Sequence, residues 1–199
     1  MEHSSSTGPA TVSPPRRRGT RQNRAVTDRS SAPAPPGLWS FRDPTGAAVV
    51  GWLNTLGAPA PGQGVCLVPQ GAPLLDRRSA VANVRLLLAL TGTSCAVADI
   101  VTALRTVEIP DQLLHVRAAR LSRSQRLAAW LGLCRLRQSR TVVMIEPFVG
   151  IPGADIDGLA RLIRETLTPG RTILLVSVDA TVGEACAATP VRDLTRTPW

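Results

Sequence analysis

The most constraining feature of this sequence is the alternation of strand and helix patterns over its last third. Residues 141–145 form a continuous β-rich apolar run, which is typical of a strand covered on both faces of a sheet. Residues 155–167 then carry apolar side chains at helical spacing, and residues 172–176 form a second apolar run. Because strands joined through a helix pair in parallel, this order predicts an α/β fold with a parallel sheet.

The rest of the chain adds two strands and several helices to this prediction. Short apolar runs at residues 38–41 and 65–68 predict the further strands. Helical patterns cover four other segments, residues 49–56, 79–90, 95–107 and 122–136. We therefore predict one domain over residues 37–199, with an α/β core and an all-helical insertion at about residues 72–120.

The first 36 residues differ in composition from the rest of the chain. They are rich in Ser, Pro, Thr and Arg and have almost no apolar periodicity. Such a segment cannot bury enough surface to offset its ordering entropy, so we expect a disordered tail. Its basic cluster, from Arg16 to Arg24, is interpreted either as a solvated segment or as a contact for anionic lipid or nucleic acid.

Charge and aromatic content restrict the function. All 23 basic residues are Arg, and the absence of Lys excludes chemistry that needs a lysine ammonium at a phosphate. Aromatic residues make up 3% of the chain, which disfavours a base-stacking surface, so nucleic acid is not the first choice of partner. No run approaches the roughly 18 apolar residues of a spanning helix, so we expect any membrane role to come through a partner.

The cysteines give no metal-site pattern. The chain has four cysteines, far apart in sequence, and two histidines, which leaves no zinc-ligand spacing and no predicted metal site. Each cysteine lies in or beside an apolar run. We interpret all four as small buried hydrophobic residues in a reducing compartment: Cys66, Cys95, Cys134 and Cys186.

Five short segments that could carry chemistry follow one another along the chain. Each lies at the end of a predicted strand or at the start of a predicted helix. They are residues 43–50, residues 68–70, residues 121–126, residues 142–148 and residues 174–179. The first has the sequence Asp-Pro-Thr-Gly-Ala-Ala-Val-Val, and the third reads Leu-Ser-Arg-Ser-Gln-Arg.

The order of these segments resembles the ATP-binding cassette family. In that family a phosphate loop, a glutamine loop, an LSGGQ-type signature, a strand ending in Asp-Glu-Pro and a strand ending in a switch histidine follow one another. Leu121 precedes Glu146 by 25 residues and Glu146 precedes Val178 by 32, close to the family's intervals. The resemblance implies a P-loop NTPase-like core, with Glu146 at the catalytic position. It places the remaining nucleotide-site positions at Gly46, Gln70, Leu121, Ser122 and Gln125.

The sequence departs from the family at the positions that carry charge. Val49 and Val50 take the Lys and Ser/Thr positions of the phosphate loop, Ile145 the metal-binding Asp, and Val178 the switch His. Three further glycines of the pattern are replaced, by Asp43, Arg123 and Ser124. A further Asp of the pattern is replaced by Pro152. Because phosphoryl transfer depends on charges that hold phosphate and metal, the resemblance implies a degenerate, non-hydrolysing subunit with an inactive Glu146. We expect weak ATP binding at most and no bound Mg²⁺.

The resemblance also implies partners. A cassette pairs with a second cassette subunit, identical or different, and with a membrane permease, which would hold this chain on the cytoplasmic side of the cell membrane. Two other functions remain open: a regulatory or scaffold protein on the same fold, and an anion or nucleic-acid binder acting through the Arg-rich tail. The site residues have structural interpretations too. Ser122 and Gln125 have the spacing of a capping box, Glu146 can simply end a strand, and Gln70 can be a loop amide.

Overall fold

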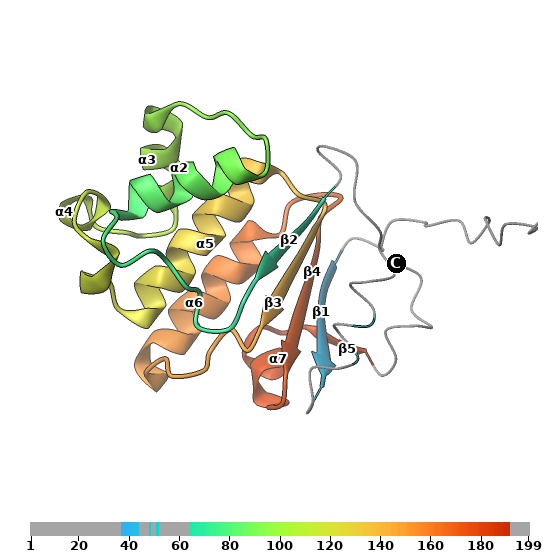
Figure 1. Cartoon of the computed structure of the whole chain (residues 1–199). Helices are drawn as coiled ribbons and strands as arrows, with labels where there is room; N and C mark the ends of the chain where they lie inside the picture. The colour runs from blue at the N-terminus through green and yellow to red at the C-terminus, as the bar shows by residue number, and fades with distance from the viewer. Residues whose placement is uncertain (1–36, 44–47, 49–50, 52–63, 192–199) are drawn as a thin grey trace, which may run out of the picture. The chain divides into compact units, whose positions relative to one another are not determined.

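The computed structural model describes residues 37–43, 48, 51 and 64–191. These residues form a five-stranded sheet in the order β2-β3-β4-β1-β5 (Figure 1). The strands are β1 (Gly37–Arg42), β2 (Val65–Val68), β3 (Thr141–Ile145), β4 (Thr172–Ser177) and β5 (Thr189–Val191). All four pairings are parallel, which confirms the predicted α/β class with a parallel sheet.

Helices fill the intervals between the strands. They are α2 (Ala80–Leu90), α3 (Val97–Thr106), α4 (Asp111–Leu114), the 3₁₀ turn η1 (Ala118–Arg120), α5 (Arg123–Arg137), α6 (Gly153–Thr166) and α7 (Thr181–Ala185). The helices predicted near α2, α3, α5 and α6 are confirmed to within about two residues at each end. The helix predicted over residues 49–56 and the tail of residues 1–36 lie outside the described residues.

The third strand is covered on both faces, as its apolar run predicted. Val142 and Val143 are fully buried although consecutive strand residues point to opposite faces. Val142 belongs to the main core on the side of α5 and α6, which lie against this face of the sheet in Figure 1. Val143 packs with Leu174 and Val176 in a smaller cluster on the other face.

The apolar stripes of α2 and α3 are used inside the chain. Both helices bury apolar side chains in the same core as Leu131 of α5: Val84 and Leu88 from α2, and Ile100 and Leu104 from α3. Burying an aliphatic side chain of this size contributes about 1.5–3 kcal/mol, so these helices are held firmly against α5. The stretch between β2 and α5 is therefore helical and well packed, while its status as a separate insertion over residues 72–120 stays a prediction.

A buried asparagine organises the loop that precedes α2. The side chain of Asn83 is 2% exposed. Its Oδ1 accepts from the amide of Leu75 at 2.7 Å, and its Nδ2 donates to the carbonyls of Leu75, Arg78 and Ser79 at 3.1, 3.3 and 2.9 Å. The amide of Ala118 donates to the carbonyl of Arg78 at 2.7 Å, which joins the start of η1 to the same loop.

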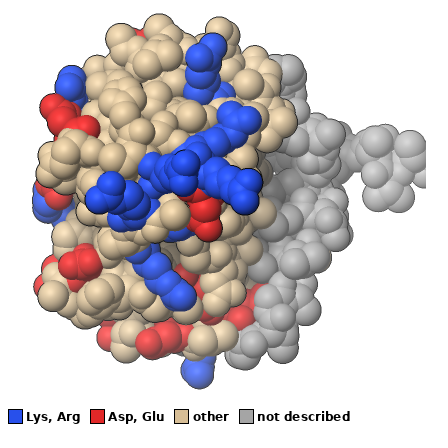
Figure 2. All heavy atoms as spheres, turned by 60° about the vertical axis from the view of Figure 1, so that its left-hand side comes forward, with Lys and Arg blue, Asp and Glu red and all other residues tan. Residues whose placement is uncertain are grey.

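Basic side chains gather over this part of the molecule, as Figure 2 shows for the face that carries the left-hand helices of Figure 1. We call Arg77, Arg78 and Arg85 the arginine surface; all three are exposed. Asp76 lies at its edge and forms an ion pair with Arg126 of α5 at 2.7 Å. Because the loop is fixed by hydrogen bonds and α2 by packing, the backbone that carries these arginines is rigid.

Candidate functional site

The carboxyl ends of four parallel strands lie along one edge of the sheet. β2 is followed by Gln70, β3 by Glu146, β4 by Val178 and β1 by Asp43. Ligands of open α/β sheets bind outside these strand ends, so the fold brings the predicted positions Gln70 and Glu146 to the edge where a site is expected. The predicted Gly46 and the phosphate-loop residues around it lie outside the described part of the chain.

Glu146 links the ends of β3 and β4. Its backbone has a φ of 47°, and its amide donates to the carbonyl of Val176 at 2.8 Å. The hydroxyl of Ser177 donates to Oε2 at 2.7 Å, and the amide of Val178 donates to Oε1 at 2.6 Å. Both carboxylate oxygens therefore bind the chain itself. This geometry supports the interpretation of Glu146 as a strand-ending residue, since its carboxylate joins the ends of β3 and β4.

Ser122 and Gln125 form a capping box at the start of α5. The amide of Gln125 donates to Oγ of Ser122 at 3.1 Å, and the amide of Ser122 donates to Oε1 of Gln125 at 2.9 Å. The structural interpretation of this spacing is thus confirmed. Leu121, directly before the cap, is 5% exposed and belongs to the core. The Ser122 hydroxyl and the Gln125 side-chain oxygen thus have partners within the chain.

The two residues inside the capping box connect α5 to the loop that follows β3. Arg123 Nη1 donates to the carbonyl of Val149 at 3.3 Å, and the hydroxyl of Ser124 is hydrogen-bonded to the Asp155 carboxylate of α6. Gly150 has a φ of 69°, and a Cβ there would overlap the guanidinium of Arg123. In the pattern that the sequence resembles, glycines stand at these two α5 positions. Here two side chains stand at those positions, and they bind the loop after β3 and the first turn of α6.

Gln70 lies in a tight turn after β2. The turn is closed by a hydrogen bond from the amide of Ala72 to the carbonyl of Pro69 at 3.0 Å, and both Gly71 and Ala72 have a positive φ. Gln70 itself is exposed. Two predicted site residues lie at the described strand ends, Gln70 and Glu146, and of these Gln70 has the exposed side chain.

At the described strand ends, the two positions that would hold a magnesium ion and carry a proton in the resembled pattern are apolar. The positions of the metal-binding Asp and the switch His in the resembled pattern are Ile145 and Val178, neither of which can ligate a metal or carry a proton. The remaining acidic group on β3 is Glu146, whose two carboxylate oxygens bind Ser177 and Val178. Among residues 64–191 and the described part of residues 37–51, no three His, Cys, Asp or Glu side chains gather into a metal-ligand cluster.

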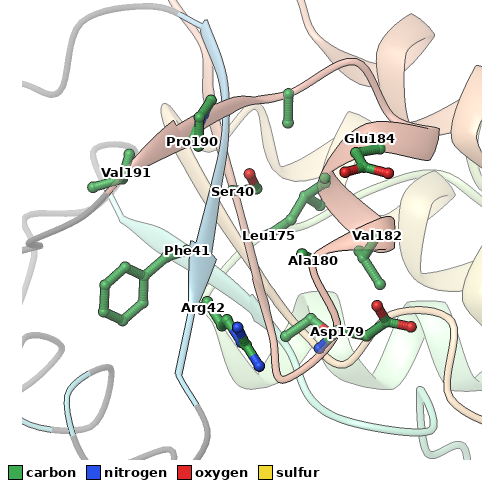
Figure 3. Close-up of a pocket in the computed structure, with 13 residues that line it drawn as sticks. Ser40, Phe41, Arg42, Leu175, Asp179, Ala180, Val182, Glu184, Pro190 and Val191 are labelled. Atoms are coloured by element: carbon green, nitrogen blue, oxygen red, sulfur yellow. The ribbon is translucent and has the colours of Figure 1, made fainter.

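Sequence reasoning missed a hollow beside these strand ends. It has a volume of about 230 Å³ and lies between β1, β4, β5 and α7 (Figure 3). Arg42 and Asp179 lie at one end of it in Figure 3, and Arg42 Nε donates to the carbonyl of Val178 at 3.2 Å. Asp179 Oδ1 accepts from the amide of Thr181 at 2.9 Å, and hydrogen bonds from Thr181 lower the pKa of Asp179. The short α7 has no apolar periodicity in the sequence that could have predicted this hollow.

The sheet and its strand-end edge define a class: the chain has the P-loop NTPase fold, in the form found in ATP-binding cassettes. It is similar to MJ0796, described as a bacterial ABC transporter cassette, in a dimeric structure, with a TM-score of 0.60, 15% identity, and coverage of 75% of this chain and 78% of that one. A post-hydrolysis dimer of MJ0796 bound to ADP and Pi gives a TM-score of 0.61 at 14% identity, with coverage of 77% and 80%.

A third similar structure comes from Pyrococcus furiosus and is assigned as a putative ABC transporter ATP-binding protein. Its TM-score is 0.59 at 19% identity, with coverage of 72% of this chain and 79% of that one. The sequence matches no protein-family model and no curated protein. No helix within the described residues is long and apolar enough to cross a membrane. The likeness thus extends to the fold of the cassettes, over most of both chains.

Proposed function

We propose that this chain is a degenerate, non-hydrolysing cassette subunit that pairs with a competent cassette and with a membrane permease. The observation that carries the proposal is the state of Glu146. Its carboxylate binds Ser177 and Val178, and the neighbouring Ile145 and Val178 are apolar where the family pattern needs a metal ligand and a proton carrier. Phosphoryl transfer rests on positioned charges, and each lost charge weakens it by several kcal/mol.

The fold supports a structural role in a pair of cassettes. The MJ0796 cassettes with the same fold are dimeric, and one of them holds ADP and Pi. In this chain the polar groups at the start of α5 are bound within the capping box and by the loop after β3. We infer that the chain binds ATP weakly or only in the presence of its partner, and that the pair relies on the other subunit for hydrolysis.

Phosphate release from the purified chain tests the loss of hydrolysis. We expect no release above a protein-free blank, with or without Mg²⁺, and Glu146→Gln should leave this result unchanged. Titration with labelled ATP, with and without Mg²⁺, measures any remaining binding in parallel. Release that Glu146→Gln abolishes would show an active glutamate and overturn the proposal.

The arginine surface is the part of the chain that we propose for docking on the partner. A shallow hollow of about 360 Å³ lies against α2 and the start of α3, with Arg78 and Arg85 among its lining residues. Its apolar lining is Val81, Ala82, Leu86, Ala89 and Val97. Guanidinium groups beside an apolar floor suit a partner segment with both acidic and apolar side chains, because Arg pairs with carboxylates in a bidentate geometry.

Charge reversal on this surface tests the docking. Arg77→Glu combined with Arg78→Glu should weaken co-purification with the permease or second cassette roughly tenfold, while the thermal melt stays within a few degrees. Arg140→Glu is the matched control, since Arg140 is exposed on the connection between α5 and β3. Undiminished association, or association weakened equally by the control, would contradict the docking surface. A chain that associates with neither protein would favour the regulatory or scaffold alternative.

A further inference from the structure

Two cysteines that are far apart in sequence meet in the core. Cys66 lies on β2 and Cys134 on α5, and their Sγ atoms are 3.1 Å apart. Both side chains are 0% exposed. The burial predicted from the sequence holds for these two and for Cys186, whereas Cys95 is only half-buried. The sequence did not predict that two of them are in contact, and either thiol can donate a hydrogen bond to the other.

Positive charge surrounds this thiol pair. Arg137, in the last turn of α5, interacts with Cys66. Arg171 is 5% exposed and is held by hydrogen bonds from Nε to the carbonyl of Ser139 at 3.0 Å and from Nη1 to that of Thr166 at 2.8 Å. The hydrogen bond with Cys134, followed by the two guanidinium groups, lowers the pKa of Cys66 against the opposing effect of burial. The hydrogen bond with Cys66, followed by burial, raises the pKa of Cys134, which favours Cys66 as the attacking thiolate.

We propose that Cys66 and Cys134 form an oxidisable dithiol that hydrogen peroxide converts into a disulfide between β2 and α5. The geometry carries this inference, because the sulfur atoms need to approach by only about 1 Å to reach bonding distance. Hydrogen peroxide is the oxidant that we propose, because both cysteines are 0% exposed and a small molecule can reach them during local opening of the core, whereas a bulky disulfide cannot.

The reaction balances in two steps. The Cys66 thiolate attacks one peroxide oxygen, so that an S–O bond forms, the O–O bond breaks, and the departing hydroxide takes up a proton to become water. The Cys134 sulfur, having lost its proton, then attacks the sulfenic sulfur of Cys66. The S–S bond forms, the S–O bond breaks, and a second water leaves. Two thiols are thereby oxidised by two electrons, and one peroxide is reduced to two waters.

The disulfide would join two elements that lead to the candidate site. β2 runs into the turn with Gln70, and α5 begins at the capping box of Ser122. The chain between the two cysteines contains α2, α3 and α4, so the bond would close a long loop around this helical segment. Closing a long loop restricts the unfolded chain and raises stability. This inference does not depend on the proposed cassette function.

The other two cysteines are internal controls. Burial raises the pKa of Cys186 to about 11, and it is packed as an isolated thiol. Burial and then the charge of Asp99 raise the pKa of Cys95. Neither has a second sulfur in hydrogen-bond contact among the interactions of the described residues. Low thiolate content makes both poorer nucleophiles toward peroxide than Cys66.

Peroxide treatment of the full chain tests the proposal. After quenching, denaturation and alkylation, mass spectrometry should show the loss of two hydrogen atoms and a linked peptide pair containing Cys66 and Cys134. The thermal midpoint should rise by roughly 10 °C and return to its starting value after reduction with a dithiol. A variant with Cys95→Ser and Cys186→Ser should behave in the same way. Cys66→Ser with Cys134→Ser should show neither change.

Three results would overturn the proposal. One is full alkylation of Cys66 and Cys134 after a treatment that oxidises Cys95, and another is a linked pair that contains Cys95 or Cys186. The third is oxidation of Cys66 that ends at the sulfinic acid without a crosslink. Because the Cys95→Ser and Cys186→Ser variant leaves the thiol pair untouched, the test stands even if replacing the pair prevents folding.

Discussion

Removing the Glu146 carboxylate should destabilise the chain rather than change a catalytic rate. Glu146→Ala deletes the acceptors of the Ser177 hydroxyl and the Val178 amide. Hydrogen bonds to a charged acceptor contribute about 1.5–3 kcal/mol each, and a buried donor left without a partner costs about 1–3 kcal/mol. Ser177 is buried at 4% exposure whereas Val178 is 49% exposed and its amide can bind water. We therefore expect a loss of about 2 kcal/mol, mostly from Ser177.

Two further substitutions separate the causes. Glu146→Gln keeps an acceptor for the Val178 amide, so we expect it to cost about 1 kcal/mol. Glu146→Gly removes the same carboxylate as Glu146→Ala but tolerates the φ of 47°. The Gly variant should therefore be more stable than the Ala variant, by up to about 1 kcal/mol.

Unfolding in guanidinium chloride measures the free energy of unfolding of the wild type and the three variants. The comparison holds if the free energy falls with denaturant concentration at the same slope in all four proteins. The expected order of stability is wild type, Gln, Gly and Ala, with a thermal midpoint about 4–8 °C lower for Ala than for wild type. If Glu146→Ala unfolds within about 0.5 kcal/mol of wild type, the carboxylate does not hold the two strand ends together. In that case the structural interpretation of Glu146 fails.

Three other outcomes are expected from the packing and the charges. Asn83→Ala removes the side chain that binds Leu75 and its neighbours and should cost about 3 kcal/mol or more in denaturant unfolding, and Asn83→Asp should cost at least as much, because it places a buried carboxylate oxygen against the three carbonyls that Nδ2 binds. A chain beginning at Gly37 should melt cooperatively, within a few degrees of the full chain, because residues 1–36 lack a core pattern; precipitation of the short chain alone would contradict this. Hydrogen bonds from Thr181 lower the pKa of Asp179 below its ordinary value of 3.8. The ionised Asp179 therefore contributes its full stabilisation of the folded chain above pH 3.8, and this stabilisation is lost as the pH falls through the lowered pKa. Melts of wild type and Asp179→Ala should therefore differ at neutral pH and converge in acid, and a constant difference would refute the contact.

Local patterns in the sequence were sufficient for several elements. β3 and β4 are continuous apolar runs, and a strand buried on both faces has few other compositions. The capping box at the start of α5 involves Ser122 and Gln125, which are three residues apart, so spacing alone predicts it. The meeting of Gln70 and Glu146 at one edge also follows from the sequence, because parallel strands bring their carboxyl ends together.

The state of the candidate site could not be predicted in this way. That both oxygens of Glu146 bind the end of β4 depends on the pairing of Ile145 with Val176, which the sequence of either strand alone does not specify. The presence of Glu146 in the expected position was thus compatible with both a catalytic and a structural role. The pairing of the strands determines which donors lie beside the carboxylate, and these are the Ser177 hydroxyl and the Val178 amide.

By itself, then, the sequence determined where buried strands and amphipathic helices form, since those patterns depend on residues a few positions apart. Only the tertiary structure decided the position of β1 between β4 and β5, the short α7 and β5, and the contact between Cys66 and Cys134. α7 has five residues and β5 has three, too few to show a period, so their neighbours hold them in place. The two cysteines are 68 residues apart, and only the packing of α5 on β2 brings their sulfur atoms together.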